Sequence, residues 1–329
     1  MVNEIWLPVL LQMISRRQLR IKALQSLYAY YKTGREDMRR SEKELHFNIE
    51  KAFELYHYLL LLLIDLVLYA ESRIEIARNK RIPTPEDLNP NTRFIENMLI
   101  KQLRINEHLL RFVDQHKLNW VNHPELIKEV YKRLIESEDY KVYMVAEEHA
   151  YAEDKRLITF IYTHIVYSSE MLYSILEEQS IFWNDDLEFI TSMIVKTFKK
   201  FKEEDGADKA LMELYKNQED KDYVVELYRQ TILHRDEYVE YIKVNTRNWD
   251  LDRIAFMDIL IMQIAIAELV AFPSIPTKVT LNEYLEISKF YSTSKSNIFI
   301  NGVLDKVVMQ LKAGKKIVKS GRGLIGEND

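Results

Sequence analysis

The sequence contains no cysteine. Disulfides, thiolate metal ligands and cysteine nucleophiles are therefore excluded. Glycine and proline are also scarce, with seven of each in 329 residues, which disfavours turn-rich β folds and favours long helices. We find no alternating strand pattern of convincing length and no internal repeat. The scarcity of glycine and proline and the lack of strand patterns therefore favour a helical protein.

Several functional signatures are missing as well. Neither a GxGxxG pattern nor a GxxxxGK[ST] phosphate loop occurs. Histidines such as His108, His116 and His123 do not have the spacing of a helical or finger metal site, so we expect no metal. The apolar stretch 6–14 has no basic region before it and no small-residue cleavage site after it. It does not resemble a signal peptide, and we expect a cytoplasmic protein with no membrane association.

The charge balance limits what the protein can bind. Its formal net charge is −5, which argues against broad affinity for nucleic acids, because that affinity comes from neutralising phosphates. Any nucleic-acid site must be a local basic patch. An apolar content of 47% is enough for a sizeable core, and the length allows two modest domains.

The most hydrophobic helix candidate covers residues 253–271. Only Asp258, Gln263 and Glu268 interrupt its apolar side chains, so it has no wide polar face. Such a helix normally forms the buried centre of a helical domain, and this one is too short to span a bilayer. Pro273 and Pro276 should end it.

Two more helices are expected after these prolines. Thr280 and Glu283 have the spacing of a capping box at the start of the first. Ser294 or Ser296 could cap the second, which should extend to about Lys312.

The last of these helices has one apolar arc and one open side. The arc, which we expect to face the core, contains Ile300, Val303, Leu304, Val307 and Leu311. Phe299 and Lys306 fall outside it, and Gly302 lies between them without a side chain. An aromatic and a lysine on an open face could stack a base and hold a phosphate. The alternative is that Phe299 packs under a neighbouring helix.

The segment SRRQLRIKALQSLYAYY, residues 15–31, also reads as a helix. Arg16, Arg17 and Arg20 crowd its start, where the helix dipole disfavours cations by roughly a few tenths of a kcal/mol each. Residues placed against local preference suggest a use elsewhere. Arg17 and Tyr28 share one edge of this helix. The alternative is a solvated face crossed by salt bridges.

These segments resemble a known family. The first helix is similar to the arginine-rich first helix of the bacterial transcription antitermination factor NusB. LDRIA, PTKVTLNEYLEISK and FINGVLDK resemble that family's C-terminal half, and KDYVVELYRQTI fits the helix before it. The resemblance implies an all-α fold of two packed helical bundles, no catalysis and no cofactor. Family members bind the boxA element of ribosomal RNA leader transcripts with the ribosomal protein NusE, within the RNA polymerase antitermination complex.

The resemblance divides the chain into four parts. Residues 1–35 carry the first NusB-like helix, and residues 221–312 form the NusB-like core. Residues 36–220 have no counterpart and form a helical insertion of unknown role, in which residues 45–79 should be a long core helix with a leucine run. Residues 313–329 are basic and glycine-rich, and we expect them to be disordered.

The resemblance also implies site residues. The positions expected to contact RNA are Arg16, Arg17, Arg20, Tyr28 and Phe299, and Lys295 and Lys306 supply cations on the same helix as Phe299. Asp258 resembles an acidic residue that meets NusE. Four positions depart from the family pattern. Gln18, Gln263 and Ile298 stand where basic residues are found, and Lys295 stands where an acid is often found.

Two other functions are open. One is a helical protein-interaction scaffold that keeps the fold without binding RNA. The other is the ribosomal RNA cytosine methyltransferase whose N-terminal domain resembles NusB. That enzyme needs a catalytic cysteine, which the sequence lacks, and a nucleotide-binding domain downstream, where only a short tail follows, so we expect a different function.

Overall fold

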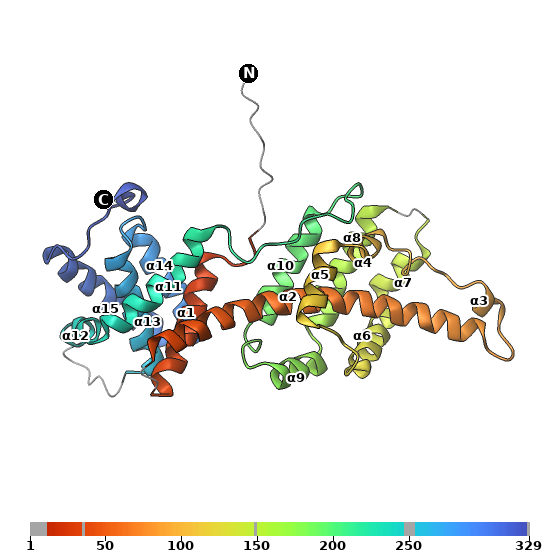
Figure 1. Ribbon diagram of the computed structural model, residues 1–329, viewed down its shortest axis with the longest axis horizontal. Coiled ribbons are helices and arrows are strands. Elements are labelled where there is room, and N and C mark those ends of the chain that lie inside the picture. Colours follow the sequence, from red (N-terminus) through yellow and green to blue (C-terminus); the bar gives the residue numbers. More distant parts are fainter. Residues whose placement is uncertain (1–11, 35–36, 148–149, 247–253, 328–329) are drawn as a thin grey trace, which may run out of the picture. The chain divides into compact units, whose positions relative to one another are not determined.

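The structure is a computed structural model that describes residues 12–34, 37–147, 150–246 and 254–327 (Figure 1). It confirms the all-α fold. Within those ranges the only β pairing is an isolated bridge between Gln12 and Glu213. The chain divides into two compact units. We call residues 14–49 and 215–329 the framework unit, and residues 1–13 and 50–214 the insertion unit.

In the sequence, the helices of the insertion unit lie between the first helix of the framework unit and its remaining helices. The framework unit contains α1 (Arg16–Lys32), α11 (Gln218–Leu233), α12 (Arg235–Asn245), α13 (Phe256–Ala271), α14 (Thr277–Tyr291), α15 (Ser294–Ala313) and the 3₁₀ turn η3 (Gly321–Leu324). The insertion unit contains α3 (Pro85–Leu88), α4 (Met98–Arg104), α5 (Glu107–His116), α6 (Pro124–Glu136), α7 (Glu138–Val145), α8 (Tyr151–Phe160), the π-helix η1 (Ile161–Val166), α9 (Glu170–Gln179) and α10 (Leu187–Lys200). Helix α2 (Met38–Arg78) belongs to both.

The main segment of the insertion unit, residues 50–214, is shorter at both ends than the range 36–220 expected for the insertion. The first turns of α2 pack within the framework unit, where the Ser41 hydroxyl bonds to Tyr228 and Lys22 Nζ donates to Asn48 Oδ1 at 3.0 Å. Because α2 continues without a break from one unit into the other, no proline or glycine marks this boundary in the sequence.

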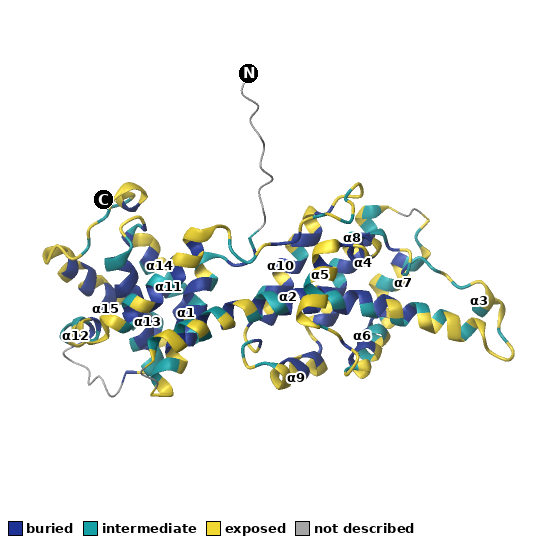
Figure 2. Ribbon diagram, in the orientation of Figure 1, coloured by how far each residue is buried: buried dark blue, intermediate teal, exposed yellow. Residues whose placement is uncertain are grey.

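Helix α13 is the centre of the framework unit, as its sequence predicts. Every residue from Leu260 to Leu269 is buried (Figure 2). Helices α1, α11, α12, α14 and α15 all pack against it. The apolar arc of α15 is buried too, with Ile300, Leu304 and Val307 fully inaccessible to solvent. Both predictions are confirmed.

The predicted helix caps of this unit are wrong. Helix α14 begins at Thr277, three residues before the expected cap, and its N-cap residue Pro276 has no side chain that could cap it. Thr280 and Glu283 instead bond to other helices. Helix α15 is capped by Thr293, whose hydroxyl accepts from the amide of Ser296. The spacing of a capping box in a sequence does not show whether its polar side chains will cap the helix or will bond to residues of other helices instead.

The segment after α15, expected to be disordered, packs against the framework unit. Lys319 Nζ donates to the carbonyls of Leu269 and Phe272, at 3.0 and 3.1 Å. Gly323 is buried against Pro273, and the two backbones are so close that a Cβ on Gly323 would lie 1.9 Å from the carbonyl oxygen of Pro273. Because glycine has no Cβ, the two backbones can approach this closely. From composition alone, the same glycine indicated a flexible segment.

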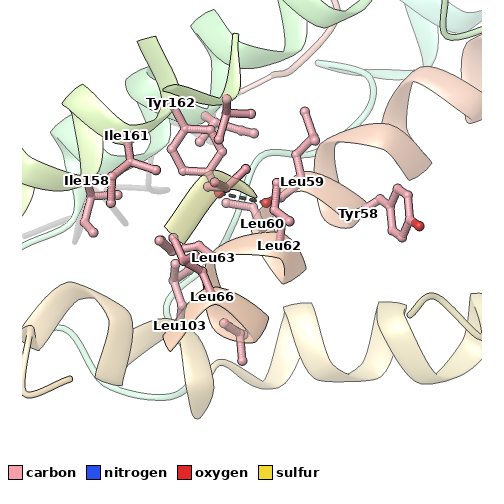
Figure 3. Close-up of a cluster of buried hydrophobic side chains, with 14 of the residues drawn as sticks. Tyr58, Leu59, Leu60, Leu62, Leu63, Leu66, Leu103, Ile158, Ile161 and Tyr162 are labelled. Carbon is pink, nitrogen blue, oxygen red and sulfur yellow. Dashed lines mark hydrogen bonds between the residues drawn. The ribbon is translucent and has the colours of Figure 1, made fainter. Parts of the chain in front are cut away.

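The insertion unit has a core of its own around α2. The leucine run of this helix packs against α4, α8 and η1, and Tyr162 donates from its hydroxyl to the carbonyl of Leu59 at 2.7 Å (Figure 3). Among the described residues, α2 is the one helix long and apolar enough to cross a membrane. However, 67% of its most apolar window is buried inside the protein, as expected of a core helix.

Candidate nucleic-acid interface

The three arginines at the start of α1 each pair with a carboxylate from another helix. Arg16 bonds to Glu219 and Asp220 of α11. Arg17 makes two bonds to Glu283 of α14, at 2.7 and 2.8 Å. These acids offset the unfavourable placement of cations at the positive end of the helix dipole. The arginines therefore tie α1 to its neighbours, as the salt-bridge alternative predicted.

Arg20 is a buried structural residue. It is 3% exposed and makes two bonds, at 2.7 and 2.8 Å, to Glu268, which is fully buried. Glu268 also accepts from the hydroxyls of Thr280, Tyr223 and Tyr284. Arg20 therefore presents no guanidinium at the surface for RNA, although the resemblance placed it among the contacts.

Arg17 keeps free donor capacity. Its Nε and Nη2 bond to Glu283, so Nη1 makes no bond to that carboxylate, and 48% of its side chain is exposed. The hydrogen bond from Arg17 lowers the pKa of Glu283, so the pair stays ionised at neutral pH. A bidentate pair of this kind holds the guanidinium plane in a fixed orientation.

Tyr28 lies at the other end of α1. It is 39% exposed. Its ring centroid lies 5.7 Å from that of Phe256, and Lys32 Nζ lies 5.7 Å from the Tyr28 centroid. The same amine is 4.8 Å from the Phe256 centroid. An aromatic ring beside a cation at the surface is suited to stacking a base next to a phosphate.

The open side of α15 carries the other candidates. Lys295 and Lys306 are exposed, and Phe299 is partly exposed. Gly302 is exposed, and a Cβ built on it would meet no atom within 4 Å. The structure thus leaves Phe299 outside the buried arc, as the helical wheel predicted.

Helix α14 makes side-chain contacts with both α1 and α15. Arg17 pairs with Glu283, and Gln25 Nε2 donates to the hydroxyl of Tyr291 at 3.1 Å. The two pairs have the same sequence offset, so α1 and α14 run side by side in the same direction. Asn297 donates to Leu285 and Ser288, near the end of α14, at 2.8 and 2.9 Å.

Tyr28 follows Gln25 by less than one turn of α1, so it lies near the end of α14 that carries Tyr291. Phe299 lies two residues after Asn297, about 200° further round α15, so it is on the side of that helix away from the Asn297 contact.

Asp258, expected to meet a partner protein, is 4% exposed and accepts a hydrogen bond from the hydroxyl of Ser292. It contributes no exposed carboxylate for a partner. Gln263, one of the departures from the family pattern, is also buried, whereas Ile298 is 78% exposed. The described part of the chain holds no group of three or more histidine, aspartate or glutamate side chains placed to bind a metal.

Sequence reasoning missed one part of this surface. A cavity of about 590 Å³ lies between the start of α1, the α13–α14 connection and the segment after α15. Arg322 lines it together with Arg16, Arg17 and Arg20. Little in the sequence indicates that Arg322 belongs to this surface, because it lies in a glycine-rich stretch for which composition predicts disorder.

The fold and the surface together define an all-α protein with an arginine-led first helix and an exposed cationic and aromatic face. Comparison with known proteins agrees. A family model described as "NusB family" matches residues 187–309. The protein named transcription antitermination protein NusB from Salinibacter ruber is 36% identical over 139 residues, which cover 40% of this chain and 87% of the relative.

Two further relatives carry the same name. That of Chloroherpeton thalassium is 39% identical over 32% of this chain and 50% of its own length. That of Natranaerobius thermophilus is 39% identical over 27% of this chain and 67% of its own length. No solved structure matches significantly. The chain belongs to the NusB family.

Proposed function

We propose that this protein is a non-enzymatic transcription antitermination factor of the cytoplasm. In this proposal it binds boxA-type single-stranded RNA of ribosomal RNA operons together with NusE, as part of the RNA polymerase antitermination complex. The family membership and the printed names of the relatives support the general role. The RNA contact is supported by the exposed side chains of Arg17, Tyr28, Lys295 and Lys306 and by the partly exposed side chain of Phe299.

The observation that carries the RNA contact is the placement of Phe299. Its neighbours Ile300 and Val303 are buried, yet Phe299 stays partly exposed between two exposed lysines. A phenylalanine left accessible on such a face can stack a base, while the lysines neutralise the adjacent phosphates. Asp258 is left out of the proposed NusE contact because it is buried.

The direct test is a titration of the protein with boxA RNA, with and without NusE. Affinity should be higher with NusE, and log K should fall linearly with log salt, by about 0.7 for each phosphate contact to a single strand. A scrambled RNA of equal length is the control. Equal affinity for boxA and scrambled RNA would contradict recognition of boxA.

Phe299→Ala is expected to weaken boxA binding by about 1–3 kcal/mol, the range for the loss of one stacked base. Ile298→Ala is the matched control, because its side chain is the immediate neighbour and is 78% exposed. Phe299→Trp should keep most of the affinity. If Phe299→Ala binds as tightly as Ile298→Ala, Phe299 stacks no base.

Gly302→Ala is expected to separate stability from RNA binding. The helix should gain about 0.5–1 kcal/mol, because alanine favours helices over glycine and the new methyl group meets no atom. RNA affinity should nevertheless fall if the strand approaches the backbone between Phe299 and Lys306. Thermal unfolding and RNA titration of the same variant check both results. Unchanged affinity would show that the strand keeps clear of Gly302.

The alternative is a protein-interaction scaffold that no longer binds RNA. The carboxylate partners of Arg16, Arg17 and Arg20 favour it, because these cations already serve the fold. A pull-down with and without RNase separates the two functions. Partners retained after RNase treatment would support the scaffold, and partners lost after it would support binding through RNA.

A further inference from the structure

The cavity at the start of α1 is lined mainly by arginine and apolar side chains. Four arginines and one carboxylate, Glu283, line it, and Ile275, Pro276, Val279 and Ile325 add apolar surface. Its volume of about 590 Å³ lies within the range of small-molecule sites. It is large enough for a nucleotide-sized group.

One of the four arginines is available to a ligand. Arg16, Arg17 and Arg20 each bond to carboxylates. Arg322, by contrast, is exposed and makes no side-chain hydrogen bond or ion pair with any residue that the structure describes. A guanidinium carries five N–H donors in a planar fork that matches a phosphate.

Contacts made by residues before and after Arg322 in the chain hold its backbone in place. Before it, Lys319 bonds to the end of α13, and the amide of Ser320 donates to the carbonyl of Pro273 at 3.0 Å. After it, Glu327 accepts from the amide of Thr277 at 3.1 Å and pairs with Lys312 at 2.6 Å. Burial alone would raise the pKa of Glu327, but its bonds to Lys312 and Thr277 outweigh burial and lower that pKa to about 2. The Glu327 carboxylate is therefore ionised at neutral pH, where it pairs with Lys312.

We propose that the segment 314–327 completes a phosphate-binding pocket and extends the RNA interface past the start of α1. This proposal rests on the proposed function. The pocket shares Arg17 with that interface. The positive end of the α1 dipole also borders it, which favours an anion. The apolar residues of the lining provide a surface for the sugar or base attached to the phosphate.

The first test compares Arg322→Ala with wild type in RNA titrations at several salt concentrations. Affinity should fall about five- to tenfold for boxA and scrambled RNA alike, and the salt slope should shrink by about 0.7, because a phosphate contact carries no sequence information. Arg39→Ala is the matched control, since Arg39 is an exposed arginine of the framework unit outside this pocket. Thermal unfolding should be unchanged in both variants.

The second test moves the segment without removing a charge. In Gly323→Ala the new methyl group would collide with the carbonyl of Pro273, so the segment must shift, and RNA affinity should fall as in Arg322→Ala. Gly314→Ala is the control, because its φ is −78° and its Cβ would meet ordinary contacts at 3.4 Å or more.

The outcomes separate this proposal from the proposed function. If wild type binds boxA RNA and Arg322→Ala matches Arg39→Ala in affinity and salt slope, the pocket proposal is overturned and the proposed function stands. A second outcome is that inorganic phosphate raises the unfolding temperature of wild type but not of Arg322→Ala, while the two bind RNA equally well. The pocket then binds free anions, and the proposal that it extends the RNA interface is wrong. If wild type binds no RNA, both fail.

Discussion

Replacing Glu268 with alanine should lower the free energy of unfolding of the framework unit by about 3–5 kcal/mol, the range for removing one partner of a buried ion pair. The change leaves the Arg20 guanidinium buried without its carboxylate. It also removes the acceptor for the hydroxyls of Thr280, Tyr223 and Tyr284. Urea unfolding followed by hydrogen exchange in peptides of the framework unit measures the effect.

Glu283→Ala is the control for this prediction. It breaks a bidentate pair of similar geometry with Arg17, but 48% of the Arg17 side chain is exposed, so water can solvate the released charge. Glu283 also lies 3.7 Å from Arg20, which keeps its two shorter bonds to Glu268. The loss should be about 0–1 kcal/mol. Equal losses in the two variants would show that burial of the Glu268 cluster adds nothing to its contribution.

Tyr162→Ala should destabilise the insertion unit by about 3–5 kcal/mol, the usual range for removing a large aromatic side chain from a core. Tyr162 is 1% exposed and packs against the leucine run of α2. Tyr162→Phe, which removes only the hydrogen bond to Leu59, should lose about 1 kcal/mol. Hydrogen exchange resolved by unit measures both.

The same variant tests whether the insertion takes part in RNA binding. All the residues proposed to contact RNA belong to the framework unit, so Tyr162→Ala should bind boxA RNA with wild-type affinity at a temperature where the framework unit stays folded. A drop in affinity that tracks unfolding of the insertion unit would place part of the RNA site in the insertion.

The sequence predicted those features of the fold that depend on local periodicity. The apolar helix α13, the buried arc of α15 and the exposed side of Phe299 all follow from residues three or four apart. It did not predict which charges would be buried. Arg20 and Glu268 lie far apart in the chain, and no local pattern connects them.

The candidate site shows the same limit. Arg17 and Tyr28 share an edge of one helix, so a helical wheel could pair them. Arg322 joins the arginines of α1 only because Gly323 packs against Pro273 and Glu327 reaches the amide of Thr277. Those contacts depend on tertiary structure, and composition alone suggested disorder.

The unbroken course of α2 restricts how the chain length can vary. Each residue added to or removed from this helix between Leu59 and Leu66 would turn every later side chain by about 100° relative to the earlier ones. Leu66 would then leave the core of the insertion unit, while Leu55 and Leu59 kept their places in it. Sequence variation within this stretch should therefore consist of substitutions rather than single-residue insertions.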